Sequence, residues 1–406
     1  MKKFIMYGAG NIGRGFIGQL FSLSGYSVGF IDINKEVIGR LNSDKEYPVD
    51  VVSNEGLEEI MVKNVYGIDG TDIELVSDEI ASADIMATAI GVNVLKFIAK
   101  PIALGLKKRF EKNAKPFNII ICENLIGADE FLKGLIKEQI PEYAEKVENE
   151  VGFVEASIGR MVPVMTEEKK QGNPLRVYVE PYNILPVDLN AFKGEVPSDV
   201  QNLYPYKPFN MFIQRKLFMH NMSHATCAYL GYLRNYEFIY QAAEDFDIKY
   251  VAYKSLIQSA LAISKENGVE IEMLISHAEN LLYRFLNKAL GDTVARVGKD
   301  TIRKLSSNDR LVGALKLCEK HNVPNEYICI GIATALVFDP DGDDSSKEVC
   351  AYAKEFGVKA TLEKYCQYTG EKVALIEELY EMIKNGKQIS ALVKVCEEAG
   401  GKQIRV

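Results

Sequence analysis

The sequence predicts a two-domain protein: an α/β domain with a parallel-rich sheet over residues 1–205, followed by a mainly α-helical domain over residues 206–406. Three observations support this division. A chain of 406 residues has room for about two or three domains. Short β-like segments alternate with helical patterns in the first third of the chain, as they do in βαβ units. From about residue 210 onward, long helical patterns replace the short apolar runs.

The first domain opens with alternating elements. We expect a strand in "KKFIMYGAG", a helix in "NIGRGFIGQLFSLSG" closed by Gly25, a second strand in "YSVGFIDIN" and a second helix in "KEVIGRLNSD". Later strand candidates are "IMATAIG", "FNIIICEN" and "EVGFVEASIGRMVPV". Because these strands are almost continuously apolar, we expect helices on both faces of a parallel sheet.

The second domain contains long amphipathic patterns. The clearest are "EDFDIKYVAYKSLIQSALAISKENG", "EIEMLISHAENLLYRFLNKALG" and "VALIEELYEMIKNG". Few strand-like runs interrupt them, so we expect this domain to be built from helices.

The composition limits the partners and the compartment. A formal net charge of −8 gives no general attraction for nucleic acid or an anionic membrane. The seven cysteines are scattered and form no CxxC pair, which favours free thiols in a reducing cytoplasm. The glycine motif begins too early for a secretory leader, and no apolar run reaches about 18 residues. We therefore expect a cytoplasmic protein without a membrane span; nothing here indicates an oligomeric state.

A glycine motif, "GAGNIG", follows the first predicted strand and opens the first predicted helix. In this context Gly8 allows a tight turn, Gly10 lets a pyrophosphate approach the backbone, and Gly13 lets helix and strand pack closely. The helix N-terminus around Asn11 and Ile12 supplies N–H donors to phosphates. The motif predicts a dinucleotide site in a Rossmann-type domain.

An acidic residue marks the end of the second strand. Asp32 stands 19 residues after Gly13, where a carboxylate binds the adenosine ribose and repels the 2′-phosphate of NADP. We therefore expect NAD as the cofactor, although Asn34 and Lys35 follow and a nearby cation can relax this preference.

Polar residues are concentrated in "KLFMHNMSH", residues 216–224. Wound as an α-helix, Lys216, His220 and His224 fall within about 80° of one another, with Asn221 about 140° from Lys216. The next residues, "ATCAYLGYL", are nearly all apolar or small, so we expect a buried helix whose polar cluster has a functional role. A zinc site is not expected, because Asn221 stands where a zincin helix requires Glu.

This layout suits a dehydrogenase. Oxidation of a secondary alcohol requires a base for the hydroxyl proton while hydride leaves for nicotinamide. Without a metal, a Lys can serve as base if burial and cationic neighbours lower its pKa to roughly 7–8. An Asn can donate to the developing oxygen charge, and a His can orient a hydroxyl or relay a proton.

Several blocks resemble the polyol-specific long-chain dehydrogenases. Lys216, Asn221 and His224 form the pattern K-x4-N-x2-H, and further matching blocks are "GAGNIGRGFIG", "TAIGVNVL", "CEN", "RKLFMHNMSHATCAYLG" and "IRKLSSNDRL". The chain departs from the family pattern at Ile213 and Gln214, where an acidic residue is common, and at "IGR" (158–160), where V-D-R is common.

The resemblance, strongest to the sugar-phosphate branch, implies NAD-dependent, metal-independent and reversible oxidation of D-mannitol 1-phosphate to D-fructose 6-phosphate. It assigns Lys216 as general base, Asn221 and His224 as substrate-binding or polarising groups, and Asn124 as a residue near nicotinamide and substrate.

A basic segment could bind the phosphate of such a substrate. Seven basic and three acidic residues from Arg284 to Arg310 leave a local charge of +4. Within it, Arg303, Lys304 and Arg310 are candidate phosphate ligands. Two alternatives stay open: an NAD-dependent reductase of an unphosphorylated hexitol, ketose or hexuronate such as tagaturonate or fructuronate, and a non-catalytic NAD-sensing protein.

Overall fold

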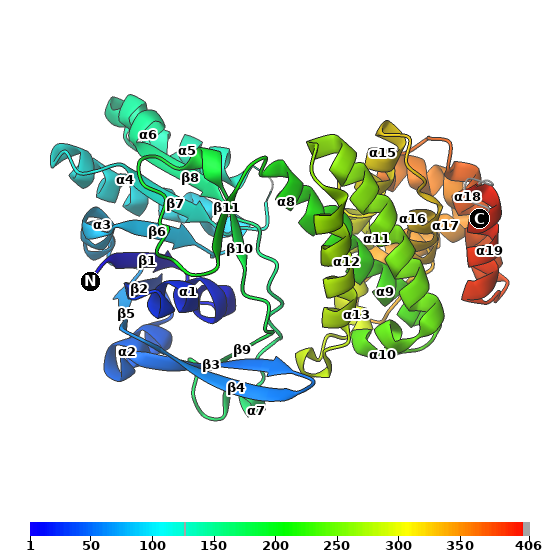
Figure 1. Cartoon of the computed structure of the whole chain (residues 1–406), viewed down its shortest axis with the longest axis horizontal. Coiled ribbons are helices and arrows are strands. Elements are labelled where there is room, and N and C mark those ends of the chain that lie inside the picture. The colour runs from blue at the N-terminus through cyan, green and yellow to red at the C-terminus, as the bar shows by residue number, and fades with distance from the viewer. Residues whose placement is uncertain (126, 401–406) are drawn as a thin grey trace. The chain divides into compact units, whose positions relative to one another are not determined.

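The computed structural model describes residues 1–125 and 127–400. It divides into two compact units, Met1–Phe209 and the chain from Asn210 onward. Figure 1 shows the helices and strands of each unit.

The first unit is built on a six-stranded parallel sheet. Its strands, from one edge to the other, are β5 (Val65–Asp69), β2 (Ser27–Asp32), β1 (Lys3–Tyr7), β6 (Ile85–Thr88), β7 (Phe117–Ile121) and β8 (Val151–Glu155). Every neighbouring pair is parallel. The strand order reverses between β1 and β6, which is the order of a dinucleotide-binding sheet. The predicted parallel-rich Rossmann-type sheet is confirmed.

Helices cover both faces of this sheet, as the apolar strands predicted. One face packs against the π-helix η1 (Gly13–Gly18), α1 (Gln19–Leu23) and α2 (Lys35–Asp44). The other packs against α3 (Ile73–Ser82), α4 (Leu95–Glu111), α5 (Ala128–Gln139) and α6 (Ala144–Glu150). Along β1, Phe4 and Met6 belong to the first core, and Ile5 and Tyr7 to the second. This alternation is the period of two of a strand buried on both sides.

A second, smaller sheet was not foreseen in the sequence. The hairpin β3 (Glu46–Ser53) and β4 (Gly56–Lys63) is antiparallel, and β9 (Val177–Val179) joins β3 in parallel. A further parallel pair joins β10 (Leu185–Asp188) and β11 (Leu203–Tyr206). The remaining short helices of this unit are η2 (Val92–Val94), η3 (Pro141–Tyr143), α7 (Glu167–Lys170) and η4 (Leu189–Ala191).

Every named element among the described residues of the second unit is a helix, which confirms the predicted mainly α-helical domain. Its elements are α8 (Asn210–Gln214), η5 (Arg215–Asn221), α9 (Met222–Leu233), α10 (Ile239–Glu244), α11 (Phe246–Asn267), α12 (Ile271–Phe285), η6 (Lys288–Leu290), α13 (Val294–Gly298), α14 (Thr301–Lys304), α15 (Val312–Lys320), α16 (Glu326–Ala335), α17 (Asp344–Thr361), η7 (Leu362–Cys366), α18 (Val373–Lys384) and α19 (Ile389–Ala399). Helix α9 is almost wholly buried and packs against α10, α11, α13 and α16.

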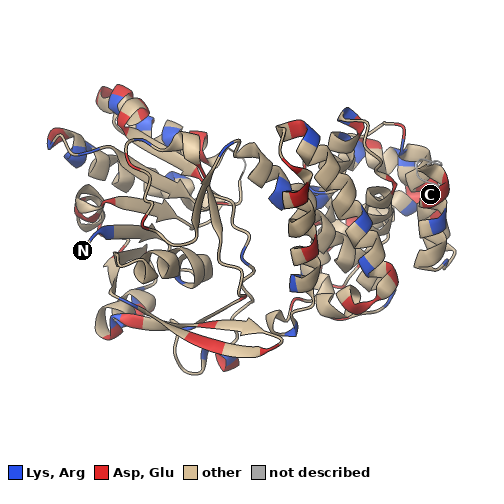
Figure 2. Ribbon diagram, in the orientation of Figure 1, with Lys and Arg blue, Asp and Glu red and all other residues tan. Residues whose placement is uncertain are grey.

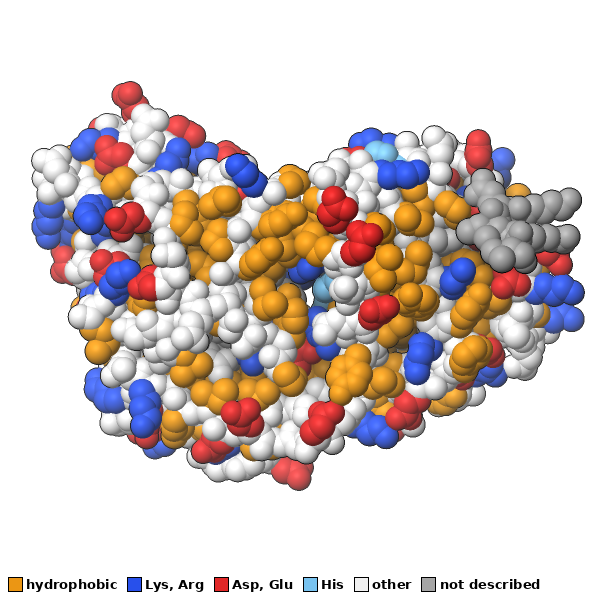
Figure 3. Space-filling view, viewed as in Figure 1, with side chains coloured by type: hydrophobic (Ala, Val, Ile, Leu, Met, Phe, Trp, Pro, Cys, Tyr) orange, Lys and Arg blue, Asp and Glu red, His pale blue; other side chains and the backbone are white. Residues whose placement is uncertain are grey.

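The surfaces of both units carry charges of both signs. Acidic and basic residues are interspersed along the ribbon (Figure 2) and among the other side chains on the face shown in Figure 3. Among the described helices, none combines the length and the apolar character that a membrane crossing requires. All seven cysteines are buried as free thiols.

Candidate active site

The glycine motif lies at the carboxyl edge of the parallel sheet, directly after β1. Gly8 has a φ of +107°, and a Cβ there would lie 2.5 Å from the Ala89 carbonyl oxygen. A Cβ on Gly13 would lie 2.0 Å from the Gly8 carbonyl oxygen, so strand and helix approach too closely for a side chain. A Cβ on Gly10 would meet no atom within 4 Å. Gly10 therefore borders open space, which is where the motif requires room for a phosphate group.

Asp32 connects the end of β2 to the glycine turn. Its Oδ2 accepts a hydrogen bond from the Ala9 N–H at 2.8 Å, and its Oδ1 accepts from the Asn34 N–H at 2.9 Å. The carboxylate is therefore held beside the glycine loop while keeping acceptor capacity for a ligand, since each oxygen carries two lone pairs. Asn11 and Ile12 lie in the first turn of the following helix. The N–H groups of a first turn have no carbonyl partner within the helix, so they can donate to a ligand at the glycine loop.

Sequence reasoning missed the role of Glu123, within the "CEN" block. Its buried carboxylate accepts hydrogen bonds from the Ile90 N–H at 3.0 Å and the Gly91 N–H at 2.9 Å. It thereby ties the loop after β6 to the loop after β7. Asn124, the predicted nicotinamide-side residue, follows it in an exposed position at the same sheet edge. The signal was present in the sequence, as an acidic residue directly after the predicted buried strand "FNIII".

A second unforeseen group at this edge is Glu155, the last residue of β8. Burial raises the pKa of its carboxyl to about 7, and the nearby Asp129 and Asp188 act in the same direction. The Gly127 N–H donates to its Oε1 at 3.3 Å, which opposes the shift. Glu155 can therefore hold or release a proton near neutral pH.

In the second unit, the predicted helix over residues 216–224 is not a regular α-helix. Residues Arg215–Asn221 form a π-helix, and α9 begins at Met222. The angles calculated for an α-helix are therefore wrong for this segment, because i→i+5 hydrogen bonds change the residues that share a side. Lys216 and Asn221 are half-buried, and His220 is buried.

The two histidines of this segment are neutral. Burial lowers the pKa of His224 to about 4, and Arg296, Arg310 and Lys304 act in the same direction, while Asp292 opposes them. The pKa of His220 is also well below its usual value because of burial, followed by the charges of Arg284, His224, His277 and Lys216. The charge of the predicted base Lys216 thus acts on His220 in η5, and the charges of the predicted phosphate ligands Lys304 and Arg310 act on His224 in α9.

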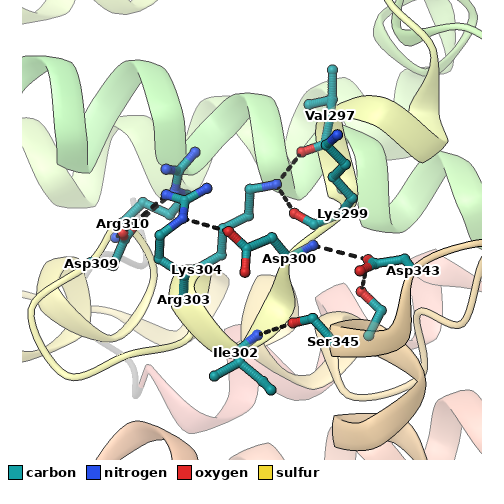
Figure 4. Close-up of polar contacts among 12 residues, drawn as sticks. Val297, Lys299, Asp300, Ile302, Arg303, Lys304, Asp309, Arg310, Asp343 and Ser345 are labelled. Atoms are coloured by element: carbon teal, nitrogen blue, oxygen red, sulfur yellow. Dashed lines mark hydrogen bonds and ion pairs between the residues drawn. The ribbon is translucent and has the colours of Figure 1, made fainter. Parts of the chain in front are cut away.

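The predicted phosphate ligands lie in and after α14 (Figure 4). The Lys304 ammonium donates to the carbonyl oxygens of Val297, at 2.7 Å, and Lys299. Burial lowers its pKa to about 7, with Arg310 and Arg303 in support, whereas the two carbonyl acceptors favour the charged form.

Both arginines of the predicted phosphate clamp contact the same aspartate. Asp309 lies 3.5 Å from Arg303 Nη1 and 2.7 Å from Arg310 Nε. Arg303 also pairs with Asp300 at 2.5 Å and is half-exposed, whereas the side chain of Arg310 is largely buried. Figure 4 shows both guanidinium groups beside Asp309. The charges of Arg310 and Lys304 act on His224, while Arg303 is half-exposed.

Two further members of this cluster were not singled out in the sequence. Asp292 forms an ion pair with Arg296, and its Oδ2 lies 3.6 Å from the Nε2 of His224. The ring of Phe285 stacks on the imidazole of His224, with centroids 4.8 Å apart and planes 12° apart. Asp292 and Phe285 both belong to the basic segment 284–310. They lie far from His224 in the sequence, so the sequence gave no sign of either contact.

The parallel sheet, its glycine turn, the carboxylate after β2 and the separate helical unit together define an NAD(P)-type dehydrogenase architecture. The sequence comparisons name the family. The Mannitol dehydrogenase Rossmann domain matches residues 2–198, and the Mannitol dehydrogenase C-terminal domain matches residues 209–395. The chain belongs to the mannitol dehydrogenase family.

Similar curated proteins span nearly the whole chain. A mannitol-1-phosphate 5-dehydrogenase from Caldanaerobacter subterraneus subsp. tengcongensis is 38% identical over 386 residues, covering 93% of this chain and 97% of the relative. The protein of the same name from Brevibacillus brevis is 37% identical over 364 residues, covering 88% and 92%.

Two solved structures share the fold. A substrate-free D-sorbitol dehydrogenase has a TM-score of 0.80 at 16% identity, covering 96% of this chain and 94% of its own. The mannitol 2-dehydrogenase of Pseudomonas fluorescens, in a ternary complex with NAD and D-mannitol, has a TM-score of 0.74 at 14% identity, covering 99% and 94%.

Proposed function

We propose that this dehydrogenase oxidises D-mannitol 1-phosphate to D-fructose 6-phosphate with NAD, reversibly and without a metal. The observation that carries the proposal is the cluster of basic residues whose charges act on His224, namely Arg296, Arg310 and Lys304, with Arg296 and Arg310 each also paired to an aspartate. This cluster would attract an anionic substrate although the whole chain has a net charge of −8. The names of the relatives, which are 36–38% identical, support the same sugar phosphate.

The residues of the first unit suit NAD. The open space at Gly10 leaves room for the pyrophosphate, and the helix N-terminus at Asn11, Ile12 and Gly13 offers N–H donors. Asp32 would accept hydrogen bonds from the ribose hydroxyls and repel a 2′-phosphate, which favours NAD over NADP. When bound, NAD supplies the acceptor for the hydride of the alcohol carbon.

The residues of the second unit would handle the proton and the oxygen. Lys216, as a neutral amine, accepts the hydroxyl proton at Nζ. The Asn221 side-chain amide donates to the oxygen as negative charge develops on it. His224, which is neutral because of its burial, binds a neighbouring hydroxyl of the substrate. Asn124 would contact the substrate beside the nicotinamide.

The phosphate is assigned to Arg303, Lys304 and Arg310. The Lys304 ammonium is already oriented by two carbonyl oxygens, and Asp309 orients both guanidinium groups. An ammonium has three donors and a guanidinium five, so each keeps N–H groups for phosphate oxygens. This arrangement would distinguish a phosphorylated ketose from a neutral one.

The decisive experiment measures NADH oxidation with fructose 6-phosphate, fructose, tagaturonate and fructuronate side by side. We expect fructose 6-phosphate to have the highest kcat/KM by at least about 100-fold over fructose, since a phosphate bound by charged donors is worth roughly 3 kcal/mol or more. A higher kcat/KM for either hexuronate or for fructose would overturn the substrate assignment. NADH binding without turnover of any of the four would indicate a non-catalytic NAD sensor.

A further inference from the structure

Asp292 occupies an unusual position between two elements of the second unit. Its Oδ1 forms an ion pair with Arg296 in α13, and its Oδ2 lies 3.6 Å from the Nε2 of His224 in α9. The carboxylate is largely buried, with 11% of the side chain exposed. It is thus a charged group held inside the protein between a permanent cation and an imidazole.

The backbone around Asp292 is fixed on both sides. The Asp292 carbonyl oxygen accepts from the Ile239 N–H at 2.9 Å, and the Val294 N–H donates to the Glu237 carbonyl oxygen at 2.8 Å. An antiparallel bridge joins Thr293 to Phe238 between these two bonds. The position of the Asp292 carboxylate is therefore set by the fold rather than by the ligand.

The imidazole of His224 is equally constrained but has an undetermined proton. Its ring stacks on Phe285, and burial keeps it neutral, with a pKa of about 4. A neutral imidazole carries a single N–H, on either Nδ1 or Nε2, and the other nitrogen is an acceptor. A carboxylate facing one nitrogen favours the proton on that nitrogen.

We propose that Asp292 is a positioning residue that holds His224 in its Nε2–H form, so that Nδ1 is presented as an acceptor to a hydroxyl group of the substrate. The same carboxylate holds the Arg296 guanidinium in place. One side chain thus orients both the acceptor nitrogen of His224 and the positive charge of Arg296. At 3.6 Å the contact is longer than a hydrogen bond, and such contacts commonly shorten in the substrate complex. The kinetic part of this inference rests on the proposed function, whereas the tautomer does not.

The competing explanation is structural: Asp292 serves only as a counter-ion for Arg296. The two explanations differ in what happens to His224 when the carboxylate is removed without loss of the fold. A counter-ion alone leaves the tautomer of His224 unchanged. A positioning residue changes it.

Nitrogen NMR of the 15N-histidine-labelled full chain tests this directly, because the sequence contains only four histidines. His224→Gln identifies the His224 signals. In the parent protein we expect Nε2 to be the protonated nitrogen and Nδ1 the unprotonated one. In Asp292→Leu we expect a mixture of both tautomers or the Nδ1–H form. A protonated Nδ1 in the parent, or an unchanged Nε2–H form in Asp292→Leu, overturns the proposal.

Kinetics supply the second measurement. Asp292→Leu should lower kcat/KM for the ketose by about tenfold or more, as expected when one hydrogen bond loses its orientation, while NADH binding is retained. Asp292→Asn keeps an oxygen acceptor for Nε2–H and should lie between this variant and the parent; it also replaces Asp292→Leu if the latter does not fold. Parental kinetics in both variants overturn the positioning role.

A matched control separates the effect from loss of any aspartate–arginine pair. Asp247 pairs with Arg234 Nη2 at 3.1 Å in the same unit, so Asp247→Asn removes a comparable charge and should keep the parental tautomer and kinetics. If fructose 6-phosphate is not a substrate but the tautomer behaves as expected, the proposed function fails and the assignment of Asp292 stands. If fructose 6-phosphate is a substrate but the tautomer does not behave as expected, the proposed function stands and the assignment of Asp292 fails.

Discussion

Replacement of Asp32 by Ala tests the cofactor site most directly, because the structure separates two effects of the change. The carboxylate accepts from the Ala9 N–H at 2.8 Å and from the Asn34 N–H at 2.9 Å. Ala9 is buried, with 2% exposed, so its N–H would lose its acceptor, at a cost of about 1–3 kcal/mol in the free energy of unfolding. Asn34 is exposed, and water can replace the carboxylate there.

The effect on the cofactor is separate from this loss of stability. A hydrogen bond from a ribose hydroxyl to a carboxylate is worth about 1.5–3 kcal/mol, so the KM for NAD should rise roughly 10- to 100-fold. NADP gains from the loss of the negative charge, so the ratio of kcat/KM for NAD over NADP should fall by more than the KM for NAD rises. Initial rates with both cofactors, together with fluorescence titration of NADH, measure these changes, and urea unfolding measures the stability.

Asp69 provides the matched control. It is the register partner of Asp32 on the neighbouring strand β5, and its carboxylate accepts from the N–H and the hydroxyl of Thr71. Asp69→Ala thus removes an acidic residue from the same sheet edge without touching the glycine turn. Its cofactor selectivity should equal that of the parent. If Asp32→Ala also discriminates NAD from NADP as the parent does, the ribose assignment is wrong.

Four further outcomes follow from the site. Lys216→Ala should lower kcat by about 10²–10⁴-fold with NADH binding retained, whereas the exposed Lys347→Ala should not; near-parental turnover would exclude Lys216 as base. A chelator should leave activity intact, because Asn221 stands where a zincin has its Glu; stoichiometric zinc whose removal stops turnover would contradict this. Lys304→Met should raise the KM for fructose 6-phosphate more than that for fructose, and it should lower stability by about 2–6 kcal/mol, because two carbonyl acceptors lose their donor; equal KM changes would argue against a phosphate contact. Glu155→Gln should stabilise the protein by about 1–2 kcal/mol at pH 8, and this gain should shrink as the pH falls towards 5. The reason is that the raised pKa of about 7 destabilises the folded state only at pH values where the carboxyl must ionise. Urea unfolding at both pH values measures the difference, which would be the same at both if the carboxyl is not responsible.

The local parts of the fold could be predicted from the sequence because their signals are local. The strand, glycine turn, helix and Asp32 lie within the first 32 residues, and the long helices α11, α12 and α18 carry their own periodicity. The small sheet β4-β3-β9 gave no such signal. Strand β4 is mostly exposed and reads "GLEEIMVK", while β9 is far away in the sequence and only three residues long. Its formation depends on long-range pairing, which no short window contains.

The electrostatic parts of the site were hidden for the same reason. The contact between Asp292 and His224 joins residues from different segments, and Glu123 acts through the backbone of Ile90 and Gly91, more than thirty positions away. The basic segment did lead to Arg303, Lys304 and Arg310 as candidate phosphate ligands. It did not predict which of them reach His224, because that depends on how α13 and α14 pack around α9.

The π-helical segments explain why a wheel drawn for an α-helix misplaces the residues of the motif. In an α-helix, Lys216 and Asn221 would be about 140° apart and could not serve one substrate oxygen easily. Within Arg215–Asn221 the backbone bonds run from i to i+5, so residues five apart follow one another along a hydrogen-bonded row, as residues four apart do in an α-helix. The spacing K-x4-N is therefore the spacing of one π-helical turn. The glycine helix follows the same rule: a Cβ on Gly18 would lie 2.8 Å from the carbonyl oxygen of Gly13, five residues earlier, in the π-helix Gly13–Gly18. In both segments, residues five apart are thus related by a π-helical backbone, a relation that a wheel of 3.6 residues per turn does not display.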